Sequence, residues 1–472
     1  MTTRGDHVSR TPVLAVLLAL ALAAGACTSS GDESDAVGTD EGSTTSGAAP
    51  TSRSSTSGTD TTPSSSTTLA PLTASFRGVT EDTIEIGVVV SDLEALRELG
   101  LVDINRGDEE LVWRTFVDEV NARGGINGRM LNLTWAPYVP TQETSASEAC
   151  ILLTEDVGVF AALGGIRGPA ASVNSCFLAD HETIMVGGTQ TPELQATAVA
   201  PWISDQMSAD RKYSGGIALM DQEGLLDGTV GLVYDSTEQG LVDDVIRPAL
   251  TDVGVTPIEG VQDIPPGDLA AAEALFPVIL ERFETEGVDT IILVQAAMNL
   301  GAGLLLDNGF DGQILGLDPT NQVSALGGYD ERLPSEFDGI IGITGASVDE
   351  RWEMPETQAC VDLFEAANPD IEVLESTQVP EGEADWAVPV VEGCRHIALF
   401  EAIAGNAGVD LTNESFAAAL ESLGTFALPG QPFNSLAVDK TDADDSLRLG
   451  IFDSTLGDEG DLAPYTELRA IG

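Results

Sequence analysis

The strongest constraint on the fold is a regular alternation of strand-like and helix-like segments that begins near residue 82. Residues 83–90 are rich in β-branched side chains, which predicts a strand. Residues 109–122 then place apolar side chains at helical spacing, and two glycines follow. Near-continuous apolar strands separated by amphipathic helices are typical of parallel sheets covered on both faces. The alternation therefore predicts an α/β fold.

The same alternation falls into two series of about four units each. Further strands are expected at 130–138, 159–163, 183–186, 229–234, 255–261, 288–294 and 313–317, and further helices at 141–156, 169–179, 241–253, 269–286 and 298–308. Helices at 350–367, 385–405 and 413–423 precede short strands near 447–452 and 468–471. Two series predict two doubly wound parallel-sheet lobes. Such sheets bind ligands at the carboxyl ends of their strands, so a ligand cleft between the lobes is expected.

Residues 1–26 have the pattern of a secretory signal peptide. Arg4 and Arg10 precede an eleven-residue apolar run, 13–23, which is shorter than the ~20 residues that span a bilayer. Small residues follow, and then Cys27. This arrangement resembles the lipobox of bacterial lipoproteins, in which the cysteine receives a diacylglycerol, although Ala24 stands where Leu is usual. We expect lipidation at Cys27; secretion with an incidental cysteine is the alternative.

Residues 27–78 consist of the lipidated cysteine and a stretch dominated by Ser, Thr, Gly, Asp and Pro. Such a composition buries too little apolar surface to offset the entropy of ordering the chain. A flexible tether of this length has a root-mean-square reach of roughly 40 Å. With no later run that resembles a spanning helix, the lipid is the only membrane attachment expected. It would hold the folded body at the outer face of the cell membrane.

The charge balance excludes several partners. The chain has 77 Asp and Glu against 20 Lys and Arg, for a formal net charge of −57. Nucleic acids and anionic lipid surfaces are bound through basic patches, and no basic run is present. The acids are spread over the body, which predicts a solvated acidic surface that disfavours capture of anionic solutes.

Three strings together resemble the leucine/isoleucine/valine-binding proteins, which are type I periplasmic solute-binding proteins of ABC transporters. They are DEVNARGGINGR at 118–129, VFAALGG at 159–165 and TPEL at 191–194. The resemblance covers about residues 82–472. It implies one lobe from 80–204 plus 348–445 and another from 205–347 plus 446–472. It also implies closure over a small solute, such as an amino acid or amide, and delivery to an ABC permease. The first string is expected to be structural, because its glycines permit a positive φ at the helix end.

The resemblance also assigns pocket residues in the first lobe. The family binds the solute's carboxylate on the loop after the third strand, where Arg167 and Gly168 stand here, with Gly168 near the place of the family's hydroxyl residue. Arg167 could hold a carboxylate through two hydrogen bonds, or pair with a surface acid. Gly188, Thr189 and Gln190 lie on the loop after the fourth strand. Ser91, at the end of the first strand, is expected to line the cleft.

In the second lobe, Asp318 occupies the place of the acid that meets the ligand's ammonium in the family. A solvated aspartate at a strand end is the alternative. Gln239 and Ala296 stand where family members often have aromatic residues. The expected pocket is therefore more polar and less aromatic than a site for branched-chain amino acids, and a zwitterion or neutral amide is the expected solute.

Four cysteines remain besides Cys27: Cys150, Cys176, Cys360 and Cys394. An even number in an exported protein predicts two disulfides. Three pairings are possible, and proximity in sequence favours Cys150–Cys176 and Cys360–Cys394, each of which joins successive helices. A metal site is the rival, but no cysteine or histidine spacing supports it.

No enzyme motif occurs, and only His181 and His396 remain after signal removal, so no catalytic residues, cofactor or metal are expected. The acidic string at 439–445 hints at calcium but lacks the glycine of an EF-hand loop, so a solvated turn is expected. The favoured function is a solute-binding subunit of an importer. Two alternatives stay open: a ligand sensor acting through a separate membrane signalling partner, and a secreted enzyme.

Overall fold

The structure is a computed structural model that describes residues 72–188, 190, 192–264, 269–317, 334–456 and 460–471. The expected signal peptide, the lipidation site Cys27 and most of the expected tether lie outside this range. Thr189 and Asp318 lie outside it as well.

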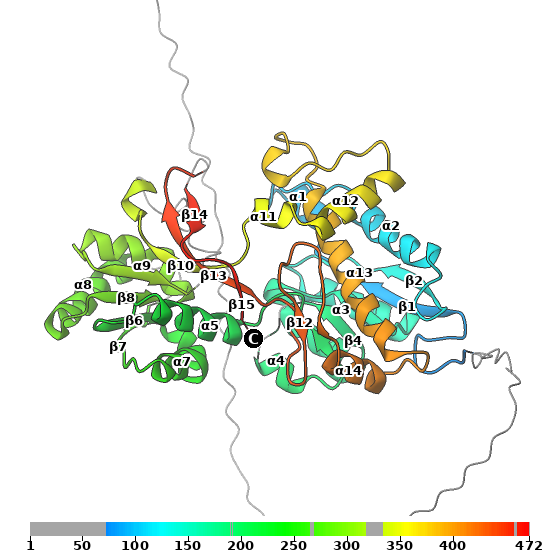
Figure 1. The fold of residues 1–472 in the computed structure, drawn as a ribbon, viewed down its shortest axis with the longest axis horizontal. Coiled ribbons are helices and arrows are strands. Elements are labelled where there is room, and N and C mark those ends of the chain that lie inside the picture. Colours follow the sequence, from blue (N-terminus) through cyan, green and yellow to red (C-terminus); the bar gives the residue numbers. More distant parts are fainter. Residues whose placement is uncertain are drawn as a thin grey trace, which may run out of the picture. The chain divides into compact units, whose positions relative to one another are not determined.

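The first sheet has five parallel strands in the order β2-β1-β3-β4-β5 (Figure 1). They are β1 (Thr83–Val88), β2 (Met130–Trp135), β3 (Ala161–Gly164), β4 (Ile184–Gly187) and β5 (Trp202–Ile203). Successive residues of β4 pack into different hydrophobic clusters, Ile184 with Phe400 and Met185 with Phe177. Both faces of this sheet are therefore covered, as the apolar strands predict.

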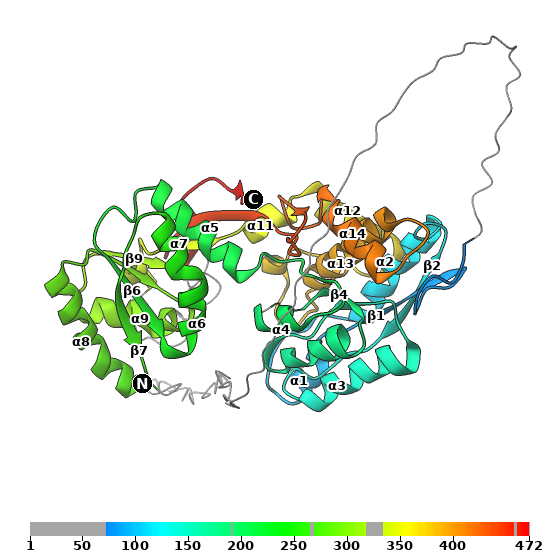
Figure 2. The same ribbon diagram turned by 90° about the horizontal axis from the view of Figure 1, so that it is seen from below.

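Helices from distant parts of the chain cover the first sheet, with α2 and α13 on the face opposite α3 (Figure 2). The helices of this part are α1 (Leu93–Glu98), α2 (Glu109–Ala122), α3 (Glu143–Ile151), α4 (Pro192–Thr197), α11 (Val348–Trp352), α12 (Pro355–Ala367), α13 (Ala387–Ala407) and α14 (Asn413–Glu421). Short 3₁₀ or π-helical turns lie at Leu152–Val157, Gly168–Val173, Cys176–Asp180 and Ser376–Gln378, and β11 (Gly424–Thr425) pairs with β12 (Ser435–Leu436).

The second sheet has the order β14-β13-β10-β9-β8-β6-β7, with β15 also paired to β13. Its strands are β6 (Val230–Asp235), β7 (Ile258–Gln262), β8 (Thr290–Leu293), β9 (Gln313–Gly316), β10 (Ile341–Thr344), β13 (Ser446–Asp453), β14 (Asp461–Pro464) and β15 (Arg469–Ala470). Its helices are α5 (Ala209–Gln222), α6 (Gln239–Leu241), α7 (Arg247–Asp252), α8 (Leu269–Glu286) and α9 (Gln295–Asp307), with shorter turns at Ser236–Glu238, Val242–Ile246 and Pro334–Phe337.

The α/β class with two helix-covered sheets is confirmed, but the second sheet is not purely parallel. The strands from β6 to β10 run parallel, whereas β13 is antiparallel to β10, and β14 and β15 are antiparallel to β13. The chain returns to this sheet just before β13, where Ser446 begins beside the carboxyl end of β10. A strand that enters there must run the opposite way.

Several elements were not predicted, among them α5 and β10. Gly215 and Gly216 interrupt the apolar pattern of α5. In the structure, these two glycines lie where the helix packs closely against its neighbours. A Cβ atom on Gly216 would lie 2.0 Å from Cδ1 of Ile343 in β10. The missing side chain thus lets the helix approach the strand closely, which a spacing pattern does not reveal.

The string at 118–129 is structural, as predicted. The Asn121 side chain donates to the carbonyl of Leu131 and accepts from its amide, at 2.9 and 2.7 Å. Asn127 donates to carbonyls at the carboxyl end of α13, including Gly408 at 3.0 Å. Arg129 is buried and donates to three backbone carbonyls, those of Thr73, Thr80 and Val409. The string therefore joins α2, β2 and α13.

These contacts also correct the end of the expected tether at residue 78. Arg129 donates to the Thr73 carbonyl at 2.8 Å, Ser75 Oγ donates to the Leu411 carbonyl at 2.8 Å, and Phe76 forms a bridge with Val79. Residues 72–78 therefore pack onto the first sheet and its helices. The boundary was misplaced because these contacts reach residues far away in sequence, such as Leu411, which composition does not reveal.

Both disulfides form as predicted from neighbouring cysteines. Cys150 of α3 is bonded to Cys176, and Cys360 of α12 to Cys394 of α13. They close loops with sequence separations of 26 and 34 residues. His181 lies close to the first pair, but sulfurs joined to each other are not thiolate ligands for a metal.

Candidate functional site

A cavity of about 180 Å³ lies at the carboxyl ends of β1 and β3, where an open parallel sheet binds its ligands. We call it the first-lobe cavity. Four segments line it: Val89, Val90, Ser91 and Leu93 after β1; Arg106 and Glu109 at the start of α2; Gly164, Gly165 and Arg167 after β3; and Val388, Pro389 and Glu392 of α13. A second cavity of about 230 Å³ shares Ser91, Arg106 and Glu109 with it.

Glycines at the ends of β3 and β4 contact each other beside the cavity. Gly164, Gly165 and Gly188 have φ angles of 91°, 77° and 82°. The Gly188 amide donates to the Gly164 carbonyl at 2.7 Å, and a Cβ atom on Gly165 would lie 2.7 Å from the Gly188 Cα. The predicted residue Gly188 therefore supports the loop after β3, but does not line the first-lobe cavity. Gln190 donates to the Trp202 carbonyl at 3.0 Å, and its Oε1 is buried without a partner among the described residues.

Ser91 and Arg167 are brought together through Tyr138. The Arg167 amide donates to the Tyr138 hydroxyl oxygen at 2.7 Å, and Ser91 Oγ donates to the same oxygen at 3.2 Å. Gly168 is exposed with a φ of 68°, so no hydroxyl occupies the place where the family has one. Tyr138 was missed because it lies beyond the end of β2 and its role depends on β1 and β3.

Arg167 lines the cavity and also pairs with two acids, one of which, Asp205, is buried rather than at the surface. Its Nη2 lies 2.9 Å from Glu392 Oε1 and 4.0 Å from Asp205 Oδ1. Burial alone would lower the pKa of Arg167, but the nearby charges of Glu392 and Asp205 outweigh burial and raise this pKa above its usual value. The guanidinium therefore stays charged. A solute carboxylate here would compete with Glu392.

A buried carboxylate that was not predicted, Asp205, lies behind this arginine. It is 1% exposed and lies just beyond β5. Arg395 Nε donates to its Oδ2 at 2.9 Å, and His396 Nε2 lies 3.6 Å from its Oδ1. Burial alone would raise the pKa of Asp205, but His396, Arg395 and Arg167 hold it well below its usual range. The residue thus stays ionised and ties the end of the first sheet to α13.

Glu109, the first residue of α2, is the acidic residue of the cavity whose side chain lacks a partner among the described residues. Its side chain makes no hydrogen bond or ion pair with another described residue. Burial raises its pKa to about 7, with the charges of Glu392 and Asp92 adding to the effect and Arg106 opposing it. The sequence offered no signal for Glu109 beyond its place in an acidic first helical turn.

Gln239, predicted on the second lobe, does not line this cavity. Gln239 is exposed on α6, where its Nε2 donates to Asp243 at 2.8 Å and its Oε1 accepts from the Tyr234 hydroxyl at 3.1 Å. Ala296 belongs to α9, and its side chain lies outside the description, as do Thr189 and Asp318. Their roles stay predictions.

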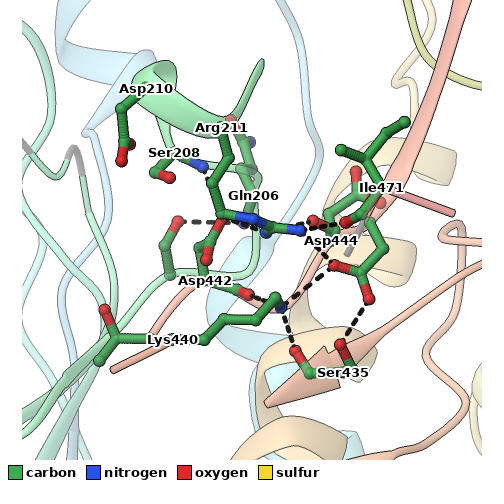
Figure 3. A network of polar contacts seen from close by, with 12 residues as sticks. Gln206, Ser208, Asp210, Arg211, Ser435, Lys440, Asp442, Asp444 and Ile471 are labelled. Carbon is green, nitrogen blue, oxygen red and sulfur yellow. Dashed lines mark hydrogen bonds and ion pairs between the residues drawn. The ribbon is translucent and has the colours of Figure 1, made fainter. Parts of the chain in front are cut away.

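Asp442 and Asp445 of the acidic string at 439–445 are buried, so the expected solvated turn is wrong for these two residues, whereas Asp439 is exposed. Asp442 and Asp445 are 3% and 5% exposed, and each lies 2.6 Å from an Arg211 nitrogen (Figure 3). Lys440 Nζ lies 3.1 Å from Asp445, and Ser435 Oγ donates to the same carboxylate at 2.6 Å. Cations from the protein therefore occupy the oxygens that a calcium ion would need.

This network joins the segments that connect the two sheets. Arg211 lies on α5, Asp442 and Asp445 lie just before β13, and the Ser208 amide donates to Asp442 at 2.8 Å. Arg211 also donates to the Ile471 carbonyl near the carboxyl terminus. The chain passes between the sheets after β5, after β10 and before β13, so the network links the first and third of these passages.

In the part of the chain that the structure describes, no helix is long and apolar enough to cross a membrane. No curated protein sequence matches the chain. Solved structures match its fold at low identity. An ABC transporter substrate-binding protein from Desulfitobacterium hafniense, in complex with Leu, is 16% identical with a TM-score of 0.54, over 81% of this chain and 100% of that chain.

Two further structures are similar. A putative branched-chain amino acid ABC transporter from Rhodospirillum rubrum is 16% identical with a TM-score of 0.54, over 82% of this chain and 100% of that one. A solute-binding protein of an ABC transporter from Rhodopseudomonas palustris BisB5, in complex with 3,4-dihydroxybenzoic acid, is 12% identical with a TM-score of 0.52. The match covers 83% of this chain and 98% of that chain.

The family model described as periplasmic binding protein matches residues 110–450, which include most of both sheets. The match confirms the family predicted from the three sequence strings. With two helix-covered sheets joined by three passages of the chain, and a cavity lined by both charged and apolar side chains at the strand ends of the first, the chain belongs to the periplasmic binding protein family.

Proposed function

We propose that the protein is the solute-binding subunit of an ABC importer, which closes its two lobes over a small polar solute and delivers it to the permease. The observation that carries this proposal is the first-lobe cavity, with its charged side chains, at the carboxyl ends of β1 and β3 in a chain of the periplasmic binding protein family. The lobes we propose are 80–204 plus 348–445 and 205–347 plus 446–472, with the contacts of residues 72–78 extending the first.

The solute we propose is an amino acid or an amide-like molecule. The cavity offers Ser91, Arg167 and Glu109, a hydroxyl and both charges, which suit a zwitterion better than an apolar or purely anionic solute. The net charge of −57 opposes long-range capture of anions. Structures of similar fold hold Leu in one case and 3,4-dihydroxybenzoic acid in another, so the fold alone does not select the solute.

A screen with a closure readout tests the binding role. The soluble protein would be titrated with amino acids, amides and small carboxylates by thermal shift and calorimetry, and small solutes carried through purification would be identified by mass spectrometry. We expect saturable binding and a smaller radius of gyration in solution scattering. Arg167→Ala should weaken binding, whereas Arg114→Ala, on the exposed side of α2, should not. A folded protein that binds no compound of the panel and carries none through purification would count against the proposal.

We further propose that the protein is exported and anchored by a lipid on Cys27 to the outer face of the membrane. The signal-like residues 1–26 and the cysteine after them support this proposal. In cells fed a labelled fatty acid, the wild-type chain should take up label and fractionate with membranes, whereas Cys27→Ala should do neither. Equal membrane association of both chains would contradict the anchor.

A further inference from the structure

Glu109 is a partly buried carboxylate that faces a cavity and has no ion-pair partner among the residues that the structure describes. It lines the first-lobe cavity together with Arg106, Arg167 and Glu392. Because isolated buried charge is costly, a carboxylate in such a place favours a cationic ligand. We propose that Glu109 binds a cationic group of the solute, an ammonium, within the first-lobe cavity. This inference rests on the proposed function and adds a specificity residue that the family resemblance does not supply.

The charged groups around Glu109 leave it as the unmatched acid. Arg167 pairs with Glu392 at 2.9 Å, and Arg106 pairs with Asp385 at 2.6 Å. The Asp92 side chain accepts from the Ala95 amide at 2.9 Å and so caps α1. Glu392 and Asp385 are thus paired with arginines, and Asp92 caps a helix.

Geometry also favours this residue as the site of a ligand amine. Glu109 is the first residue of α2, on the cavity wall beside the end of β1, and Arg167 comes from the loop after β3. A zwitterion could therefore meet a carboxylate and a guanidinium of the same lobe. The family's acid, at the place of Asp318, belongs instead to the second lobe.

Binding an ammonium has a consequence for the proton on Glu109. Near neutral pH this carboxyl is partly protonated, since burial, Glu392 and Asp92 raise its pKa to about 7 against the opposing charge of Arg106. An ammonium favours the ionised form, so the carboxyl transfers its proton to the buffer as the ion pair forms. At pH 6 about one proton is released per bound cation, and by pH 9 almost none.

The first test observes Glu109 directly and needs no knowledge of the solute. In protein labelled with ¹³C-glutamate, the Glu109 carboxyl resonance is the one missing from the Glu109→Gln variant. Butylamine and butyrate serve as probes with the same four-carbon chain and opposite charge, at constant ionic strength. We expect butylamine, and not butyrate, to lower the midpoint of this titration. A midpoint that responds to neither probe, or equally to both, overturns the inference.

The second test uses any solute that binds the wild-type protein. Calorimetry in two buffers of different ionisation enthalpy measures the protons released. Glu109→Gln should weaken an amine-bearing solute roughly ten- to hundredfold and abolish proton release. Glu119→Gln, on the same helix and outside both cavities, should change neither. Equal affinity and proton release in Glu109→Gln and wild type would refute the role of Glu109 while leaving the binding function intact. Absence of any solute would refute the binding function, and the butylamine titration would still decide on Glu109.

Discussion

Removal of the Arg129 side chain tests how the family string holds the first lobe together. Arg129 is 1% exposed, and its guanidinium donates to the carbonyls of Thr80, Val409 and Thr73 at 2.7, 2.8 and 2.8 Å. Arg129→Ala leaves these three acceptors without their donor in a nearly closed site. Each buried unsatisfied carbonyl costs about 1–3 kcal/mol, and water entering the new space would recover part of that. We expect a loss of roughly 3–6 kcal/mol in the free energy of unfolding.

Urea unfolding followed by tryptophan fluorescence and circular dichroism measures this loss. The matched control is Arg123→Ala, six residues earlier, whose guanidinium forms an exposed ion pair with Glu401 at 2.8 Å. Such exposed pairs contribute about 0–1 kcal/mol. Hydrogen exchange should also rise at residues 72–80 in Arg129→Ala and not in the control. If the two variants lose the same stability, the three buried hydrogen bonds are not what holds this segment.

Three further predictions concern stability. Asp205→Ala should lose about 3–5 kcal/mol at neutral pH, because Arg395 and the buried His396 are left without the anion they face. The pKa of Asp205 is held well below its usual range, so the advantage of the wild type should be complete above about pH 4 and shrink progressively as the pH falls below it. A denaturation series in which this advantage stays the same from about pH 5 to pH 2 would contradict this assignment. The pKa of Glu109 is raised to about 7, so the folded state holds the proton more tightly than the unfolded chain, and the wild type loses stability as the pH rises from about 4.5 to 7. Glu109→Gln should therefore match the stability of the wild type at about pH 4 and exceed it by up to about 3 kcal/mol at pH 8. A constant difference in stability across this range would refute the assigned protonation. Replacing both Cys150 and Cys176 by Ala should lower the free energy of unfolding by roughly 3 kcal/mol; stability unchanged by the replacement, with the wild-type disulfide verified by mass spectrometry, would show that the loop closure contributes nothing.

The regular elements were largely predictable, because their signals are local. The helix at 109–122 and the helix at 269–286 have the predicted bounds, since helical spacing and flanking breakers specify both ends. The disulfide partners were also predictable, because each pair joins neighbouring helices. By contrast α5 was missed, since its glycines act through contact with β10, and the antiparallel direction of β13 depends on where the chain re-enters the sheet.

The candidate site was predictable only in its location. A strand that ends in glycines predicts a ligand loop, and Ser91 and Arg167 do lie on the cavity wall. The hydroxyl that connects them comes from Tyr138, beyond the end of a different strand. Glu109 carries no local signal, because its raised pKa results from burial and from Glu392, which lies on α13. Charge in a sequence does not show which acids lack a partner in space.

The sequence by itself determined the α/β class and favoured the two disulfide pairs that form, because periodicity and neighbouring cysteines act over a few tens of residues, and the resemblance of three strings indicated the family. Only the tertiary structure decided which charges are buried. Asp205 meets Arg395 across 190 residues, and Arg211 meets Asp445 across 234. In a chain with a net charge of −57, the buried carboxylates Asp205, Asp442 and Asp445 each lie beside a cation that the fold brings from a distant segment. The acidic string at 439–445 therefore reads as a surface turn in sequence and lies within a buried ion-pair network in the folded protein.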